Sequence, residues 1–304
     1  MNKVAIIDMG TNTFHLLVAE VNGEEFKITH REKAAVKLGV GGINRNLITT
    51  EAQARALHTM KAFRNTLNEM GIDRVHAFGT SALRNASNGL EVATRIEGET
   101  GIKINIISGL QEAEYICQGA RAAIAMGAQK HLVMDIGGGS VEFIIANHSE
   151  IFWSNSFEIG GQRLLERFQK HDPIHPDEVN ALFAYFESEL RPLLNQLKLH
   201  RPTTLIGSSG TFDTLSDIYC FRNNMPVTEL PETPFALKAF DSIYEEILFK
   251  DRAARMQIPG MIEMRVEMIV VACCLIKYLL QAYRFEALRV SSYSLKEGAL
   301  VNLR

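Results

Sequence analysis

Apolar positions in the first third of the chain switch between helical and strand-like spacing. Before residue 71 they recur three or four apart, on one face of a predicted helix: Leu57, Met60, Phe63, Leu67 and Met70. The short segments 74–79 and 103–107 instead have the composition of strands. Strands that alternate with helices in this way indicate an α/β fold with helices covering mixed sheets.

The second half of the chain is richer in predicted helix. The polar segment 176–197 predicts one helix, and a strand at 203–207 follows it. A longer apolar segment, 266–283, is interrupted by Glu267 and Lys277, so that its clean apolar core covers only residues 268–276. Because a membrane-spanning helix needs about 20 apolar residues, this segment predicts a buried helix.

A near-repeat divides the chain into two related parts. Residues 5–19 align without a gap on residues 132–146, and both copies consist of a strand, an Asp-x-Gly turn and a second strand. The repeat predicts a duplicated fold with one domain at 1–125 and another at 126–291. We expect the boundary near residues 125–130, where Gly127 can end a helix. A C-terminal helix at 292–304 is expected to pack back on the first domain.

Composition narrows the class of protein. The 304 residues are 46% hydrophobic and 22% charged, which is typical of a globular protein rather than a disordered one. The 32 basic and 35 acidic side chains give a net charge of −3, which argues against a nucleic-acid or membrane partner. The apolar stretch between Lys3 and Asp8 is too short for a signal peptide, so we expect a cytoplasmic protein.

The cysteines and histidines add little candidate chemistry. Cysteine occurs at four positions without a Cys-x-x-Cys pair, so we expect buried, reduced thiols. His171 and His175 have the i, i+4 spacing of a zinc-binding helix, but Pro173 lies between them. A loop before a helix is the better interpretation of that segment.

Turns rich in Gly, Ser and Thr are the candidate phosphate-binding segments. Backbone N–H groups of such turns can bind phosphate oxygens, and an adjacent Asp can hold a divalent cation. A single turn is more often a plain hairpin or helix cap, but three in one α/β architecture favour a phosphate site. The candidate residues are Gly10, Thr11, Asn12 and Thr13 in the first turn, Gly137, Gly138, Gly139 and Ser140 in the second, and Ser209, Gly210 and Thr211 in the third. Asp8 and Asp135 precede the first two turns and are the candidate metal ligands.

Six segments together resemble one family. They are residues 5–16 (AIIDMGTNTFHL), 79–86 (GTSALRNA), 106–113 (IISGLQEA), 135–142 (DIGGGSVE), 207–211 (GSSGT) and 294–298 (SLKEG). The chain resembles the exopolyphosphatase and guanosine pentaphosphate phosphohydrolase family. That resemblance implies the actin-like fold of two α/β domains with the active site in the cleft between them, and hydrolysis of a terminal phosphoanhydride with Mg²⁺ or Mn²⁺.

The resemblance also implies roles for single residues. Glu112 matches the catalytic glutamate that orients or deprotonates the attacking water, and Arg84 matches an arginine that reaches the phosphates. Glu142 is a weaker third candidate for the metal. A polyanionic phosphate substrate and a homodimer are expected.

The residues around Glu112 also have a purely structural interpretation. Ser108 and Gln111 have the spacing of a capping box, and a helix start favours a nearby carboxylate. Both interpretations can hold together, and the helix N-terminus is then expected to keep Glu112 ionised. Gln111 stands where many relatives have Glu, and it can fill the same capping position.

Other departures from the family pattern concern charge and size near the predicted site. Lys37 and Lys296 replace frequent arginines, Val40 replaces a frequent acidic residue and Val141 a frequent threonine.

The sequence leaves three functions open. They are a metal-dependent exophosphatase, a kinase of the same fold group, and a non-catalytic sensor of polyphosphate or an alarmone, and the presence of Glu112 favours catalysis over sensing.

Overall fold

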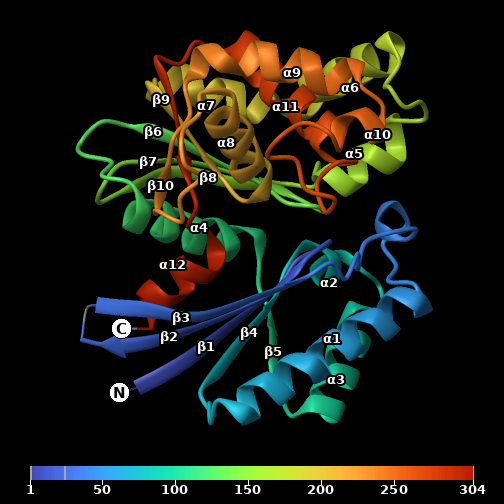
Figure 1. Cartoon of the computed structure of the whole chain (residues 1–304), viewed down its shortest axis with the longest axis vertical. Coiled ribbons are helices and arrows are strands. Elements are labelled where there is room, and N and C mark those ends of the chain that lie inside the picture. The colour runs from blue at the N-terminus through green and yellow to red at the C-terminus, as the bar shows by residue number, and fades with distance from the viewer. Residues whose placement is uncertain (1, 24, 304) are drawn as a thin grey trace.

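Two α/β halves, each built on one sheet, lie one above the other in the computed structural model, which describes residues 2–23 and 25–303 (Figure 1). The first sheet has five strands in the order β3-β2-β1-β4-β5. Their bounds are β1 (Asn2–Met9), β2 (Phe14–Asn22), β3 (Glu25–Ala34), β4 (Val75–Gly79) and β5 (Ile104–Ile106). Strands β1 and β2 form an antiparallel hairpin, whereas β4 and β5 run parallel to β1.

Helices α1 (Thr50–Glu69) and α3 (Gly89–Thr100) pack on one face of this sheet. The predicted periodicity is confirmed, because Met60, Phe63 and Leu67 of α1 are buried. Burial of each such side chain contributes about 1.5–3 kcal/mol. The Thr49 hydroxyl accepts from the Ala52 amide at 3.3 Å and caps α1. The short elements η1 (Ile43–Arg45) and α2 (Ser81–Asn85) lie toward the second half.

The second sheet has six strands in the order β10-β11-β9-β6-β7-β8. Their bounds are β6 (His131–Ile136), β7 (Val141–Ala146), β8 (Ile151–Phe157), β9 (Thr204–Ser208), β10 (Glu232–Thr233) and β11 (Ala287–Ser291). The outer face is covered by most of the remaining helices: α5 (Gly161–Phe168), α6 (Pro176–Glu189), α7 (Arg191–His200), α8 (Gly210–Arg222), η2 (Leu237–Ala239), α9 (Phe240–Phe249), α10 (Arg252–Arg255) and α11 (Ile269–Ala282).

One predicted helix is two helices in the structure. The segment 176–197 was expected to be continuous, but α6 ends at Glu189 and α7 begins at Arg191. Pro192 lies in the first turn of α7, where its missing N–H costs nothing. The same ring would clash with a carbonyl of a preceding turn if α6 continued through it, so proline explains the break.

The duplicated hairpins occupy the same place in the two sheets. Asp8 of β1 pairs with His15 of β2, and Asp135 of β6 pairs with Glu142 of β7. In each half the first strand of the hairpin also runs parallel to a later strand, β4 in the first half and β9 in the second. The duplicated architecture predicted from the repeat is confirmed, and the predicted boundary near 125–130 falls between β5 and β6.

Two helices fill the space between the sheets (Figure 1). Helix α4 (Gly109–Ala123) packs on the second sheet, and α12 (Leu295–Asn302) packs on α4 and on β1. Their close approach depends on Gly298, since a Cβ atom there would lie 1.7 Å from the Tyr115 carbonyl oxygen. The helix expected at 292–304 therefore begins at Leu295 and reaches both halves.

Two other sequence expectations can be compared with the structure. The four cysteines, Cys117, Cys220, Cys273 and Cys274, are free and buried, as expected. Within residues 2–23 and 25–303, no helix combines the length and the apolar character that crossing a membrane would require.

Candidate functional site

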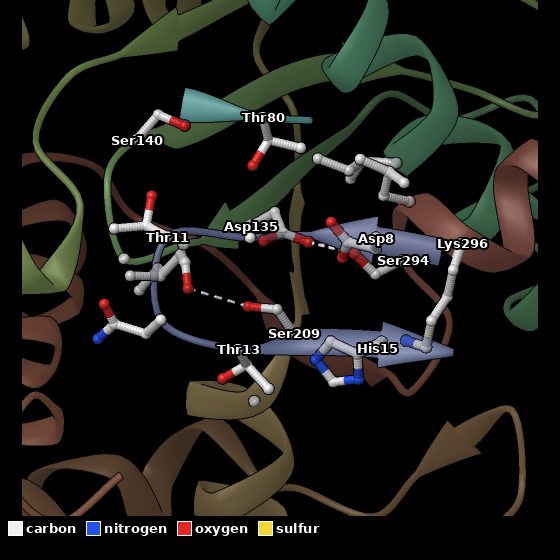
Figure 2. Close-up of a pocket in the computed structure, with 18 of the residues that line it drawn as sticks. Asp8, Thr11, Thr13, His15, Thr80, Asp135, Ser140, Ser209, Ser294 and Lys296 are labelled. Carbon is white, nitrogen blue, oxygen red and sulfur yellow. Dashed lines mark hydrogen bonds between the residues drawn. The ribbon is translucent and has the colours of Figure 1, made fainter. Parts of the chain in front are cut away.

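The three predicted turns meet at one cavity between the two halves (Figure 2). The cavity has a volume of about 110 Å³. Thr11 lies on one side of the view and Lys296 on the other, with Asp135 and Asp8 between them. The predicted residues that line it are Asp8, Gly10, Thr11, Asn12, Thr13, Glu112, Asp135, Gly137, Gly138, Gly139, Ser140, Ser209 and Gly210. Arg84, Glu142 and Thr211 are not among its lining residues.

The first turn is held by its carbonyl groups. Its chain folds back through a bond from the Gly10 amide to the Thr13 carbonyl at 3.1 Å. The Asn12 carbonyl accepts from the Lys37 amide at 2.8 Å, and the Thr11 carbonyl accepts from the Gly39 amide at 2.9 Å. Because these carbonyls are engaged by the segment after β3, the turn can offer its amide N–H groups to an anion.

The second turn repeats this construction with different partners. The Gly137 amide donates to the Ser140 carbonyl at 3.0 Å, which corresponds to the bond in the first turn. The three glycine carbonyls then accept from consecutive amides at the start of α5, at 2.8–3.1 Å: Gly139 from Gly160, Gly137 from Gly161 and Gly138 from Gln162. The start of α5 therefore fixes the orientation of the whole second turn.

Close approach explains why Gly160 carries no side chain. A Cβ atom at this position would lie 2.4 Å from the Gly139 carbonyl carbon and 2.5 Å from that of Gly138. These are backbone atoms, so the second turn would have to move. We expect Gly160→Ala to lower the free energy of unfolding by roughly 1–3 kcal/mol and to weaken binding of tripolyphosphate, as measured by urea denaturation and calorimetry.

Gly98→Ala is the matched control for Gly160→Ala. Gly98 lies in α3, and a Cβ atom there meets no atom within 4 Å. Helix propensity predicts stabilisation by about 0.5–1 kcal/mol at an exposed helical glycine. Equal effects of the two substitutions would contradict the steric account of the second turn.

The third turn opens α8 after β9. Ser209 has φ of +72°, and its hydroxyl donates to the Ile136 carbonyl at 3.0 Å. Gly210 follows, and a Cβ atom there would lie 2.1 Å from Nη2 of Arg265. The turn therefore lies between the strand that carries Asp135 and a buried guanidinium group.

The two aspartates have different surroundings. Oδ2 of Asp135 accepts from the Ser208 hydroxyl at 3.0 Å and from the Ser294 hydroxyl at 2.6 Å. Asp8 lies beside it (Figure 2), and burial raises the pKa of Asp8 to about 7, while the Lys296 ammonium lowers it and Asp135 raises it. Two adjacent carboxylates, one of them reluctant to ionise, form an environment that favours a cation.

Glu142 is buried behind the cavity. Its side chain is only 1% exposed, and Oε1 accepts from the Ser156 hydroxyl at 2.7 Å. Burial raises the pKa of Glu142 well above its usual value, and the nearby Glu112 and Asp135 carboxylates add to this effect. The raised pKa favours the protonated, uncharged form of Glu142, and the residue does not line the cavity.

Glu112 lies in the first turn of α4 and is 7% exposed. The predicted N-cap is confirmed, because the Ser108 hydroxyl accepts from the Gln111 amide at 3.2 Å. The Gln111 side chain instead donates to the Tyr115 hydroxyl at 3.4 Å, so the capping box is incomplete. Oε2 of Glu112 accepts from Nη1 of Arg84 at 2.8 Å.

The expectation that the helix start keeps Glu112 fully ionised is wrong for this state. Burial raises the pKa of Glu112 to about 7, although the Arg84 guanidinium lowers it. The loss of hydration, with the nearby Asp8 and Asp135 carboxylates, therefore outweighs the ion pair with Arg84. A carboxylate with a pKa near neutrality is suited to exchange a proton with water.

Several residues of the cavity were missed by the sequence analysis. They are His15, Lys33, Thr80, Asp213, Arg265, Ser292 and Ser294. Lys296 also lines the cavity, although the sequence analysis noted it only as a departure from the family pattern. Lys33 could have been found from strand pairing, since it lies opposite His15. Arg265 lies in an irregular segment before α11, where no periodic signal exists.

The missed cations bear directly on anion binding. Burial, together with the nearby Arg265 guanidinium, lowers the pKa of Lys33 to about 8. Nε of Arg265 and Oδ1 of Asp213 are buried, and neither has a hydrogen-bond partner in the part of the chain that the structure describes. Buried polar atoms without partners are costly, so an anion that bonds to Arg265 would remove a penalty.

The described residues do not form a metal site of three or more protein side chains. Across residues 2–23 and 25–303, no group of at least three His, Cys, Asp or Glu side chains could hold a metal ion. Asp8 and Asp135 nevertheless fit Mg²⁺ or Mn²⁺, because Mg²⁺ takes one or two protein carboxylates and completes its octahedron with water and substrate phosphates. Binding of the cation by Asp8 and Asp135 therefore requires phosphate in the same cavity.

Solved structures share this fold. The crystal structure of an exopolyphosphatase from Cytophaga hutchinsonii is 44% identical, superposes with a TM-score of 0.95 and matches 99% of this chain and 97% of that chain. An Aquifex aeolicus member of the Ppx/GppA family, 23% identical, superposes with a TM-score of 0.80 over 99% of this chain and 97% of that one. The expected duplicated α/β fold, with one sheet in each half, is confirmed.

Sequence comparisons, and above all the match to a family model, show the family of this chain. A guanosine-5'-triphosphate,3'-diphosphate pyrophosphatase of Pseudoalteromonas translucida is 28% identical over 303 residues, which is 99% of this chain and 59% of the relative. The chain therefore spans about three fifths of the length of that protein. The sequence model of the Ppx/GppA phosphatase family matches residues 17–304, which is most of the chain, and the protein therefore belongs to this family.

Proposed function

We propose that this protein hydrolyses the terminal phosphoanhydride of inorganic polyphosphate or guanosine pentaphosphate and releases orthophosphate. One observation carries the proposal: Glu112 lines the same cavity as the three turns that are predicted to bind phosphate. Family membership supports this reaction class. A kinase would need an acceptor in place of the attacking water, and a sensor would need no carboxylate beside the phosphate.

The residues divide the work of the reaction between binding and water activation. Amide groups of the first two turns bind oxygens of the terminal phosphoryl group, and Lys33, Arg265 and Lys296 offset its charge. Glu112 orients the attacking water and takes its proton. Since the transition state of phosphoryl transfer is loose, the position of the water matters more than the strength of the base.

A divalent cation completes the proposed site. Asp8 and Asp135 would hold Mg²⁺ or Mn²⁺ together with substrate oxygens, and the cation would favour the ionised form of Glu142 behind them. Such a cation neutralises charge on the bridging and terminal phosphate oxygens. The homodimer and the cytoplasmic location remain predictions.

Orthophosphate release on a panel of substrates tests the function. We expect release from long-chain polyphosphate, tripolyphosphate or guanosine pentaphosphate that depends on Mg²⁺ or Mn²⁺ and is abolished by chelation. Tight binding of these compounds without release would favour the sensor. Loss of the terminal phosphate only when an acceptor is added would favour the kinase.

The acidic limb of the pH profile should report Glu112. Because the pKa of Glu112 is raised to about 7, its carboxyl group is ionised above that pH and protonated below it. We expect kcat/KM to rise as pH increases through about 7. Titration of the substrate affects the pH profiles of the original protein and of Glu112→Gln equally. An identical acidic limb in the two profiles would therefore show that Glu112 is not the group responsible.

A further inference from the structure

The carboxylate of Glu158 connects the two halves beside the second turn. Glu158 follows β8 in the second half, whereas Ser81 and Arg84 belong to α2 in the first half. Oε2 of Glu158 accepts from the Ser81 hydroxyl at 2.7 Å and from Nη2 of Arg163 at 3.1 Å. Oε1 accepts from Nη2 of Arg84 at 3.4 Å. Two guanidinium groups and one hydroxyl therefore converge on a single carboxylate.

The donors around Glu158 are fixed more firmly than the carboxylate itself. The side chains of Arg84 and Arg163 are 16% and 11% exposed, whereas that of Glu158 is 40% exposed. Arg84 also donates to the Ile107 carbonyl at 3.1 Å, and Arg163 donates to the Ile43 carbonyl at 2.7 Å. The donors would keep their places if Glu158 turned into solvent.

This group of donors adjoins the proposed active site. Nε of Arg163 donates at 2.9 Å to the carbonyl of Gly139, which lines the cavity. A Cβ atom at Gly139 would lie 2.4 Å from Oγ of Ser81, so that hydroxyl touches the second turn. Arg84 in turn bonds to Glu112. An anion held by these donors would lie next to a phosphoryl group in the cavity.

The chemistry of the donor set matches a phosphate. Guanidinium groups bind phosphate and carboxylate oxygens in the same fork geometry, and a hydroxyl donates equally well to either. A phosphoryl group carries more charge and more acceptor oxygens than a carboxylate. The Glu158 carboxylate thus occupies a place where a phosphoryl group could bind more strongly.

We propose that Ser81, Arg84 and Arg163 form a second phosphoryl subsite that Glu158 occupies as an internal competitor until substrate displaces it. The proposal rests on the proposed function for the identity of the ligand, a chain of linked phosphates whose terminal group lies in the cavity. Displacement exchanges one set of hydrogen bonds for another and changes no covalent bond. The substrate must therefore compete with Glu158, which weakens its apparent affinity.

Binding of a methylene-bridged triphosphonate in the presence of Mg²⁺ tests the subsite without hydrolysis. Removal of the competitor in Glu158→Gln and Glu158→Ala should lower the calorimetric Kd by about tenfold, as expected if the occupied form predominates. Ser81→Ala and Arg163→Gln should raise it. Glu150→Gln removes the same charge from the exposed turn between β7 and β8, and should leave the Kd unchanged.

The opposite result identifies a different role for Glu158. If Glu158 merely holds Arg84 in place, both of its variants will bind the triphosphonate as weakly as or more weakly than the original protein, and the proposal is wrong. Thermal unfolding of each variant, measured in parallel, separates this outcome from loss of folded protein.

Measurements of turnover distinguish failure of the proposed subsite from failure of the proposed function. A lower Kd in the Glu158 variants without hydrolysis of any phosphoanhydride would support the subsite and contradict the function. Hydrolysis with an unchanged Kd would support the function and contradict the subsite. If both hold, KM should fall in Glu158→Gln while kcat does not.

Discussion

Glu112→Gln should lower kcat by about two to four orders of magnitude while leaving the fold intact. Glutamine has the same size and can still accept from Arg84, so the packing of α4 is retained. It cannot take a proton from water, and the substitution removes the only carboxylate that α4 contributes to the cavity lining. Orthophosphate release under saturating substrate and metal measures the loss.

Glu114→Gln is the matched control for this prediction. Glu114 lies on the same helix but is exposed, so the substitution changes the net charge equally without touching the cavity. We expect its kcat to stay within about twofold of the original, as for most surface substitutions. If Glu112→Gln turned over substrate as fast as Glu114→Gln does, Glu112 would have no part in the mechanism.

Asp135→Asn should raise the Mg²⁺ concentration needed for half-maximal activity by at least about tenfold. The amide oxygen of asparagine can still accept from Ser208 and Ser294, so the local structure should survive. The lost negative charge, however, leaves Asp8 as the single carboxylate beside the cation. A metal titration of the initial rate measures the shift.

The control for Asp135→Asn is a change of equal charge far from the cavity. Asp177 lies in the first turn of α6, and its side chain is 86% exposed. Asp177→Asn should leave the metal dependence unaltered. Equal metal titrations for Asp135→Asn and Asp177→Asn would contradict the assignment of Asp135 to the cation.

The repeat made much of the fold predictable. Each hairpin combines two segments of strand-forming residues with an Asp-x-Gly turn, and this local signal does not depend on tertiary contacts. The third turn was recognisable for the same reason, because a strand that ends at Ser208 and a helix that begins at Gly210 flank it. Local chemistry therefore identified all three turns that line the cavity.

Features that depend on tertiary packing could not be predicted in this way. The raised pKa of Glu112 comes from burial between the two halves, and a helix start read in isolation indicates the opposite. Arg265 and Glu158 reach the site from segments without regular periodicity. Their positions follow from how β8, α5 and α11 pack, which no local pattern encodes.

Arg84 illustrates both what a sequence motif can predict and what depends on tertiary packing. The family motif marked it as a phosphate ligand, and the structure places its guanidinium between Glu112 and Glu158 instead of in the cavity lining. Its role in binding phosphate remains a prediction. The proposed displacement of Glu158 would free part of its hydrogen-bonding capacity for substrate.

The central claim is that the first two turns bind one phosphate chain together, from opposite sides of the cavity. Hydrogen exchange of Glu112→Gln, with and without tripolyphosphate and Mg²⁺, tests it most directly because this variant should bind without turnover. The account predicts that the amides of residues 8–13 and of residues 135–140 both exchange more slowly when ligand is bound. Protection of only one turn, with binding established by calorimetry, would contradict it.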